Sequence, residues 1–95
     1  MSEKNLKTNV CKMIKKDFPK AWVWKISDKF YAGIPDLLVL IEGNAIFMEL
    51  KYGKNTLQKI QIYTIDQINK AGIKAVEIRS VAQAKLEILN LIERR

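Results

Sequence analysis

The sequence predicts a single α/β domain, built around a mixed sheet of about four strands in the order αβββαβα. Three segments have apolar residues at helical spacing, and four shorter segments have the alternating or continuous apolar pattern of strands. The four glycines and two prolines all fall between these segments. No repeat, low-complexity tract or linker interrupts the chain, so residues 1–95 are expected to form one domain.

The first helix is expected over residues 3–17. Its apolar residues recur every three or four positions, Ser2 can cap its first turn, and Pro19 cannot continue it. Cys11 lies beside the apolar stripe, and the sequence offers no histidine to activate a thiol. We therefore expect Cys11 to be a small buried residue rather than a nucleophile.

The first strand is expected over residues 21–27, where side chains alternate between two faces. Trp22 and Trp24 share one face, and Val23 and Lys25 share the other. Tryptophans on a strand can stack on nucleotide bases, but alternating aromatic residues are more often core residues. We therefore expect both tryptophans in the core.

The next two strands are expected to form a hairpin. Residues 36–41 are apolar after the first residue, which is typical of a central strand buried on both faces. A turn at Gly43 and Asn44 leads into a strand over residues 45–52. Because the turns are short, the first three strands should form an antiparallel meander.

The second half of the chain is expected to supply a helix, a strand and a last helix. Asn55 or Thr56 can cap the first of these helices, and Gly72 ends it. Residues 73–78 have the pattern of a short strand, and residues 80–83 form a capping-box pattern that opens the last helix. The strand–helix–strand unit should place the last strand parallel to its predecessor by a right-handed crossover.

Positive charge is concentrated at the start of the chain. The 17 basic residues outnumber the 10 acidic ones, which gives a formal net charge of +7. Residues 1–35 hold eight lysines and three acidic residues. Lysines outnumber arginines by 14 to three, and lysine contacts phosphates as a point charge whereas arginine forks read guanine. The expected partner is a nucleic acid that is bound through its backbone and shape.

The composition excludes several classes of protein and of site. The longest apolar run, residues 37–41, is far shorter than the roughly 20 residues that cross a bilayer, and the lysine-rich start lacks a secretory signal. We therefore expect a soluble, cytoplasmic protein without membrane association. With no histidine and one cysteine, a zinc cluster and a histidine-based triad are excluded, so any metal must have oxygen ligands.

Two carboxylates and a lysine lie where a sheet core should be apolar. Asp36 opens the most apolar strand, and Glu49 and Lys51 share one face of the strand after the turn. The hairpin can bring the two carboxylates together, and they repel each other unless a cation lies between them. Mg²⁺ and Mn²⁺ prefer such oxygen ligands, which could include the Leu50 carbonyl. Lys51 could then hold or deprotonate an attacking water for phosphodiester hydrolysis. The alternative is an ion-paired patch at the end of the sheet.

The two strands of the hairpin carry motifs that resemble the P-D…(D/E)-x-K signature of the PD-(D/E)XK nucleases. More narrowly, nearly the whole chain resembles the virus-type replication-repair nuclease (VRR-NUC) domain, in which a glycine precedes the proline and a glutamine follows on the next helix. Gln61 matches that glutamine, and Glu3 matches a glutamate on the first helix. The matching segments are Gly33-Ile34-Pro35-Asp36 and Glu49-Leu50-Lys51.

This resemblance implies a restriction-endonuclease-like core and a role for each matching residue. Asp36, Glu49 and the Leu50 carbonyl would bind Mg²⁺ or Mn²⁺, and Glu3 would be a further ligand. Asp36, Glu49, Lys51 and Gln61 would be catalytic, with Lys51 activating water and Gln61 orienting water or the scissile phosphate.

The function implied is that of a metal-dependent endodeoxyribonuclease. Similarity to stand-alone domains of phages and other viruses implies cleavage of branched DNA, such as a four-way junction, by a homodimer in the cytoplasm of a bacterial or other host cell. Duplex DNA is a second expected substrate. Two alternatives stay open: a noncatalytic nucleic-acid-binding protein, and a nuclease subunit of a larger replication, repair or restriction assembly. The preference for DNA over RNA and the number of metal ions also stay open.

Overall fold

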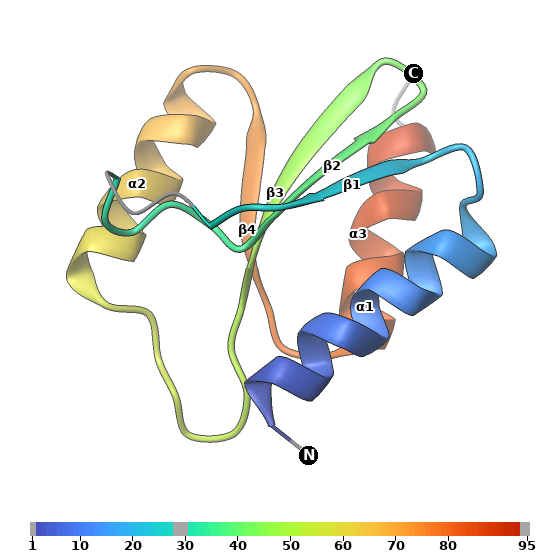
Figure 1. Cartoon of the computed structure of the whole chain (residues 1–95). Coiled ribbons are helices and arrows are strands. Elements are labelled where there is room, and N and C mark those ends of the chain that lie inside the picture. The colour runs from blue at the N-terminus through green and yellow to red at the C-terminus, as the bar shows by residue number, and fades with distance from the viewer. Residues whose placement is uncertain (1, 28–30, 94–95) are drawn as a thin grey trace.

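The computed structural model describes residues 2–27 and 31–93, which form a four-stranded mixed sheet between helices (Figure 1). Helices α1 and α3 lie side by side on one face of the sheet, and α2 lies on the other. This arrangement confirms the predicted αβββαβα order. The elements are α1 (Glu3–Asp17), β1 (Trp22–Lys25), β2 (Leu37–Ile41), β3 (Asn44–Leu50), α2 (Lys59–Lys70), β4 (Lys74–Ile78) and α3 (Val81–Glu93).

The strands follow one another across the sheet in chain order. β1 pairs antiparallel with β2, β2 pairs antiparallel with β3, and β4 pairs parallel with β3. Within the hairpin, Leu37 pairs with Met48 and Ile41 pairs with Asn44. The two-residue turn is therefore Glu42 and Gly43, one position earlier than predicted. Both have positive φ, 49° and 79°, as a type I′ turn requires, and glycine adopts this conformation without strain.

The hydrophobic core lies between the sheet and the layer of α1 and α3. Leu6, Val10 and Ile14 succeed one another at intervals of four on α1, and they pack with alternate residues of β2 and β3. Ser2 caps α1, since its Oγ accepts a hydrogen bond from Asn5 N at 3.2 Å. The buried side chains of this layer include Leu37, Val39, Ile41, Ile46, Met48, Leu50, Ile78, Ala84 and Ile88.

Helix α2 begins later than predicted. Its N-cap is Gln58 rather than Asn55 or Thr56, and Gln61 Oε1 accepts a hydrogen bond from Gln58 N at 2.9 Å. Arg79 donates hydrogen bonds to the carbonyls of Gly53 and Asn55, which holds this segment as a loop. The last helix begins as predicted, with Ser80 Oγ accepting from Gln83 N at 3.0 Å.

The expected burial of the two tryptophans is wrong. Trp22 and Trp24 are 53% and 56% exposed, and Val23 on the opposite face packs against the core. Leu40 on the neighbouring β2 is also 40% exposed, so β2 is buried fully on one face only. The reason is the position of α2, which packs mainly against β4 at the far edge of the sheet and leaves the β1 side of its face open.

Two further features bear on the expected class of protein and on Cys11. No helix among residues 2–27 and 31–93 is long and apolar enough to cross a bilayer. Cys11 is half-buried against the core, and this burial raises the pKa of its thiol. A thiol with a raised pKa is a poorer nucleophile at neutral pH, in line with a packing role.

Candidate active site

The predicted site residues come together at one end of the sheet. Because Leu37 pairs with Met48, Asp36 at the start of β2 comes next to the Glu49 end of β3. Asp36 Oδ2 accepts a hydrogen bond from Leu50 N at 2.9 Å. The carbonyl of Asp36 in turn accepts from Ile26 N at 2.8 Å, so the backbone at Asp36 is held from β1 as well.

The turn before Asp36 is shaped by Gly33. Its φ of +84° is in the left-handed region, and a Cβ built there would lie 2.7 Å from the carbonyl oxygen of Ile60. Only glycine therefore lets this loop lie against the start of α2. Pro35 is fully buried directly before Asp36, which further fixes the backbone.

Glu49 is the most enclosed charged residue of the site, with 3% of its surface exposed, and its polar neighbours include Gln61 and Lys51. Gln61 Nε2 donates a hydrogen bond to Glu49 Oε2 at 3.2 Å. Lys51 Nζ lies 3.7 Å from the same oxygen and is itself 8% exposed. Lys51 N donates to Ile78 O at 3.0 Å, which continues the backbone pairing with β4 and fixes the start of its side chain.

The electrostatics of Glu49 show how tightly the two carboxyl groups are brought together. Burial, and next the negative charge of Asp36, raise the pKa of Glu49 to about 8, whereas Lys51 lowers it. The negative charge of Glu3 also raises the pKa of Glu49, by a smaller amount. Ionisation of Glu49 at neutral pH is therefore unfavourable in the protein alone, and a cation beside it would remove that penalty.

The donor set fits a hard divalent cation. Asp36 and Glu49 offer carboxylate oxygens, and the Leu50 backbone lies directly beside them. Glu3 Oε1 is buried and has no hydrogen-bond partner. Buried polar atoms normally have a partner, and a bound cation could supply one for this oxygen. In the part of the chain that the structure describes, no three carboxylate or thiol groups converge as a metal cluster. The proposed set is therefore two carboxylates and a carbonyl, and Glu3 would have to move closer to them to become a further ligand.

Lys7 is a site residue that the sequence analysis did not identify. Its Nζ lies 3.8 Å from Asp36 Oδ1. Lys7 follows Glu3 by four residues on α1, so the two side chains lie on the same face of the helix. A small cavity of about 330 Å³ beside it is lined by Glu3, Lys4, Lys7, Thr8 and Lys25. The sequence signal for Lys7 is its i, i+4 spacing from Glu3. This spacing does not predict the contact with Asp36, because that contact depends on α1 packing beside the end of β2.

Arg79 is a second residue that sequence reasoning missed. It follows β4, pairs with Glu77 at 2.9 Å, and donates to the carbonyl of Gly53 at 3.0 Å and to that of Asn55. These bonds hold the loop that follows Lys51. No local sequence pattern predicts this role. Arg79 and Gly53 are 26 residues apart, and the parallel pairing of β3 with β4 brings them together.

Two solved structures resemble the chain over nearly its whole length. One is described as a "VRR_NUC domain protein"; it has a TM-score of 0.80 and 21% sequence identity, and the match covers 98% of this chain and 89% of that one. Another, described as a "VRR_NUC domain", has a TM-score of 0.70 and 26% identity, with 99% and 98% covered. No family model matches the sequence, and no curated protein matches it significantly. The chain therefore has the structure of a VRR-NUC domain, which confirms the resemblance carried by its motifs.

Proposed function

We propose that this chain is a Mg²⁺- or Mn²⁺-dependent endonuclease that hydrolyses phosphodiester bonds in DNA, with branched DNA as its preferred substrate. The nuclease class is supported by the similarity to VRR-NUC domains. The single observation that carries the metal-dependent chemistry is the buried contact of Glu49 with Asp36, Lys51 and Gln61 at one end of the sheet. Each carboxylate has a lysine nearby, Lys7 at 3.8 Å from Asp36 and Lys51 at 3.7 Å from Glu49. Even so, burial and the charge of Asp36 raise the pKa of Glu49 to about 8, which a simple ion-paired patch would not require.

Each residue has a role that its position supports. Asp36, Glu49 and the Leu50 carbonyl would hold the cation, and the orphaned Glu3 Oε1 would approach it from α1. A bound divalent cation supplies charge stabilisation at the phosphoryl oxygens and eases deprotonation of water. Lys51 orients the attacking water and accepts its proton or stabilises the charge that develops on the phosphate. Gln61 holds Glu49 in place and presents the rest of its amide to water or phosphate.

The reaction that these roles support is hydrolysis. The oxygen of water forms a bond to phosphorus and loses a proton, the phosphorus bond to the leaving sugar oxygen breaks, and that oxygen takes up a proton. Lys4, Lys7 and Lys25 line the cavity beside the site, and Lys7 also lies 3.8 Å from Asp36. They are suited to hold the phosphates on either side of the scissile bond.

The proposal that the substrate is branched DNA requires the chain to act as a homodimer. Symmetric cleavage of a four-way junction takes two active sites, and each chain contains one site. A two-fold dimer supplies the second site in a fixed relation to the first. The location that we propose is the cytoplasm of the host cell, where such DNA is found.

The test is a panel of labelled linear, flap and four-way DNA, incubated with the protein in Mn²⁺, in Mg²⁺ and in EDTA. We expect cleavage in both metals, none in EDTA, and the fastest cutting on the four-way substrate. Failure to cut any of the substrates in either metal would contradict the nuclease proposal. RNA counterparts of the linear substrates in the same panel decide between the two nucleic acids.

The noncatalytic alternative is separated by Lys51→Ala, compared with Lys70→Ala as a matched control. Lys70 pairs with Asp66 on the exposed side of α2, away from the site. We expect Lys51→Ala to abolish cleavage while DNA binding stays within a few-fold of wild type, and Lys70→Ala to leave both unchanged. If cleavage appears only when a host extract is added, the chain is instead a subunit of a larger assembly.

A further inference from the structure

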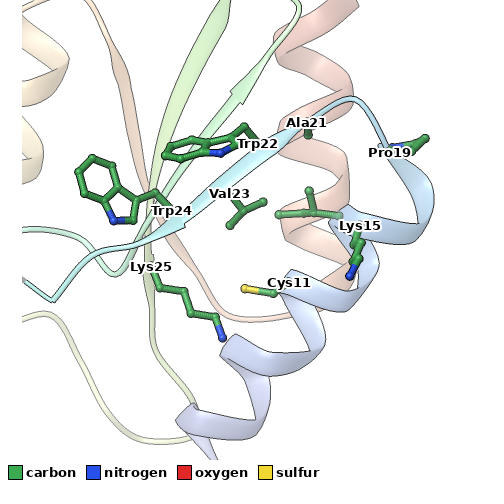
Figure 2. A pocket seen from close by; sticks show the side chains of 9 residues that line it. Cys11, Lys15, Pro19, Ala21, Trp22, Val23, Trp24 and Lys25 are labelled. Atoms are coloured by element: carbon green, nitrogen blue, oxygen red, sulfur yellow. The ribbon is translucent and has the colours of Figure 1, made fainter.

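The two tryptophans of β1 are exposed on an edge strand of the sheet. Trp22 and Trp24 are 53% and 56% exposed, and their rings lie edge to face, with centroids 5.8 Å apart and an interplanar angle of 63°. β1 is at one end of the strand order, and within residues 2–27 and 31–93 it pairs with β2 alone. Figure 2 shows both indole rings on the opposite side of β1 from Cys11 and from the side chain of Val23. Neither ring therefore belongs to the core between the sheet and α1.

A groove with a volume of about 610 Å³ lies between this edge of β1 and helix α1 (Figure 2). We call it the edge groove. Both tryptophans line it from β1, and its charged side chains are Lys15 on α1 and Lys25 on β1. No acidic residue is among the described residues that line it. A neighbouring cavity of about 420 Å³ at Trp22 is lined by Lys20 and also by Glu42.

The three lysines around the tryptophans lack ion-pair partners in the part of the chain that the structure describes. Neither Lys15, Lys20 nor Lys25 forms an ion pair with a described residue. Such a surface is unusual for contact with another protein, because lysine is depleted in the cores of protein interfaces. It suits a single-stranded nucleic acid, since unpaired bases stack on aromatic rings and phosphates are attracted to lysines. A duplex fits less well, because its bases are already stacked on one another.

We propose that the edge groove binds single-stranded nucleic acid, with unpaired bases stacked on Trp22 and Trp24 and with phosphates held by Lys15 and Lys25. Stacking of this kind tolerates any base sequence, because every base has an aromatic face. The groove would therefore recognise the absence of base pairing rather than a particular sequence. Single-strand binding stands on the groove alone, whereas its part in selecting a substrate rests on the proposed nuclease function.

The edge groove adjoins the candidate active site at Lys25. This residue lines the edge groove and also the cavity of about 330 Å³ beside the site. Lys7, in the second cavity, lies 3.8 Å from Asp36. A strand that leaves the tryptophans past Lys25 would therefore continue towards the proposed catalytic carboxylates. The substrate favoured by this arrangement is a DNA with an unpaired tail next to the duplex that is cut.

The first test uses the fluorescence of the tryptophans in the wild type. Trp22 and Trp24 are the only tryptophans in the sequence, so the emission of the protein reports on the edge groove. The protein is titrated in EDTA with an oligothymidylate of about 12 nucleotides, a usual length for a single-strand site. An abasic strand with the same number of phosphates and a blunt duplex are the controls. We expect strong quenching by the oligothymidylate and little quenching by either control.

The second test measures how tightly variants bind the same labelled strands by fluorescence anisotropy. Trp22→Gln/Trp24→Gln should bind the oligothymidylate roughly 25-fold more weakly or worse, since stacking on one ring contributes a factor of roughly five or more. Its affinity for the abasic strand should be unchanged. The matched control is Tyr63→Gln, because Tyr63 is 60% exposed on α2 and points roughly 200° around the helix from Gln61. This variant should bind like wild type.

The lysines are tested separately through the salt dependence of binding. Lys15→Gln should weaken binding of both the oligothymidylate and the abasic strand, and it should reduce the slope of log affinity against log salt by roughly 0.7. Lys70→Gln, on the exposed side of α2, is the control and should leave the slope unchanged. The tryptophan double variant should also keep the wild-type slope, because it removes no charge.

Three results would overturn the proposal. They are equal quenching by the oligothymidylate and the abasic strand, quenching by the blunt duplex as strong as that by the oligothymidylate, and wild-type affinity for the oligothymidylate in the double variant. An acidic peptide that quenches the tryptophans when the oligothymidylate does not would overturn it in favour of a protein partner. If the double variant fails to fold by circular dichroism, Trp24→Gln replaces it. A roughly five-fold loss of affinity then supports the proposal, and wild-type affinity overturns it.

A cleavage assay separates this proposal from the proposed function. In Mn²⁺, wild type should reach half-maximal cleavage at a lower concentration of tailed duplex than of blunt duplex. The tryptophan double variant should lose this preference, with its maximal rate and Mn²⁺ affinity unchanged. A protein that binds the oligothymidylate as expected but cuts no DNA would contradict the nuclease proposal and leave single-strand binding standing. A protein that cuts DNA but shows neither quenching nor a preference for tails would contradict the role of the edge groove alone.

Discussion

The active-site end of the sheet and the two tryptophans of β1, Trp22 and Trp24, lie on the same side of the sheet, and they reverse the usual distribution of polar and apolar groups. At the active-site end, Glu49 and Lys51 are buried; on β1, two indole rings are exposed. Burial of charge is costly unless the charges have partners, and exposure of large apolar groups is costly unless something covers them. The buried carboxylates therefore indicate a cation from outside the chain, whereas the two tryptophans are open to solvent.

The difference between the regions lies in how much of each is complete within one chain. Glu49 already has Gln61 and Lys51 as neighbours, and Asp36 is held by the backbone of Leu50. The tryptophans contact each other and leave much of their surface open. Perturbations at the active-site end should therefore alter chemistry in a preformed site.

The largest effect is expected for Asp36→Asn. Loss of this carboxylate removes a metal ligand, and the expected fall in cleavage rate is about 10³-fold or more, since metal catalysis contributes several kcal/mol. Calorimetric titration with Mn²⁺ should show a matching loss of affinity. Asp66→Asn, which changes an exposed carboxylate on α2, is the matched control and should behave like wild type. Unchanged Mn²⁺ affinity in Asp36→Asn would contradict the metal assignment.

A smaller effect is expected for Gln61→Ala. The side chain holds a metal-binding carboxylate without replacing it, and removal of such supporting groups typically costs roughly 10- to 100-fold in activity or metal affinity. The reduction should be seen in the single-turnover rate at saturating DNA. Gln67→Ala, an exposed position on the same helix, controls for changes in helix stability. Equal rates for wild type and Gln61→Ala would show that Glu49 needs no such support.

Arg79→Ala should have a modest effect of a few-fold on the cleavage rate. It frees the loop after Lys51, because the carbonyls of Gly53 and Asn55 lose their donor while the backbone bond from Lys51 to Ile78 remains. Hydrogen exchange should rise in residues 52–58 and stay unchanged in β2. If exchange in this loop is unaffected, Arg79 does not position it.

The last prediction concerns stability rather than cleavage, and it is a dependence of stability on pH in the absence of metal. The folded protein holds the pKa of Glu49 at about 8, above its ordinary value of 4.5. The folded state therefore binds a proton that the unfolded state releases between these values, and this contribution to stability is lost as pH rises through 8. We expect the midpoint of thermal unfolding in EDTA to fall from pH 5.5 to pH 9.

Glu49→Gln should remove most of that slope, because glutamine does not titrate. Added Mn²⁺ should also reduce the slope in the wild type, since a cation stabilises the ionised pair. A slope that is equal in wild type and Glu49→Gln would place its origin elsewhere in the chain.

The motifs of the hairpin were sufficient to predict which residues meet at the candidate site. Asp36 and Glu49 lie on either side of a tight turn, so their approach is fixed by local pairing, and a shift of one residue in the turn left it intact. Gln61 could be predicted because a glutamine on the inward stripe of a helix needs a polar partner. Lys7 and Arg79 could not, since their contacts depend on how separate elements pack.

The tryptophans show where the sequence is insufficient. Alternation along β1 correctly divides the side chains between two faces, but it does not say which face the helices cover. That depends on α2 packing toward β4, at the other edge of the sheet. The start of α2 was misplaced for a related reason, because the arginine that holds the preceding loop comes from a distant strand.

The most direct test of the central claim is a crystal structure of the wild type soaked in Mn²⁺, with anomalous data collected to locate the metal. The account predicts an anomalous peak in direct coordination with the carboxylates of Asp36 and Glu49 and with the carbonyl of Leu50, and its loss in Asp36→Asn crystals. A structure in which Mn²⁺ occupies other residues, or in which Lys51 pairs with both carboxylates and no metal enters, would contradict the claim.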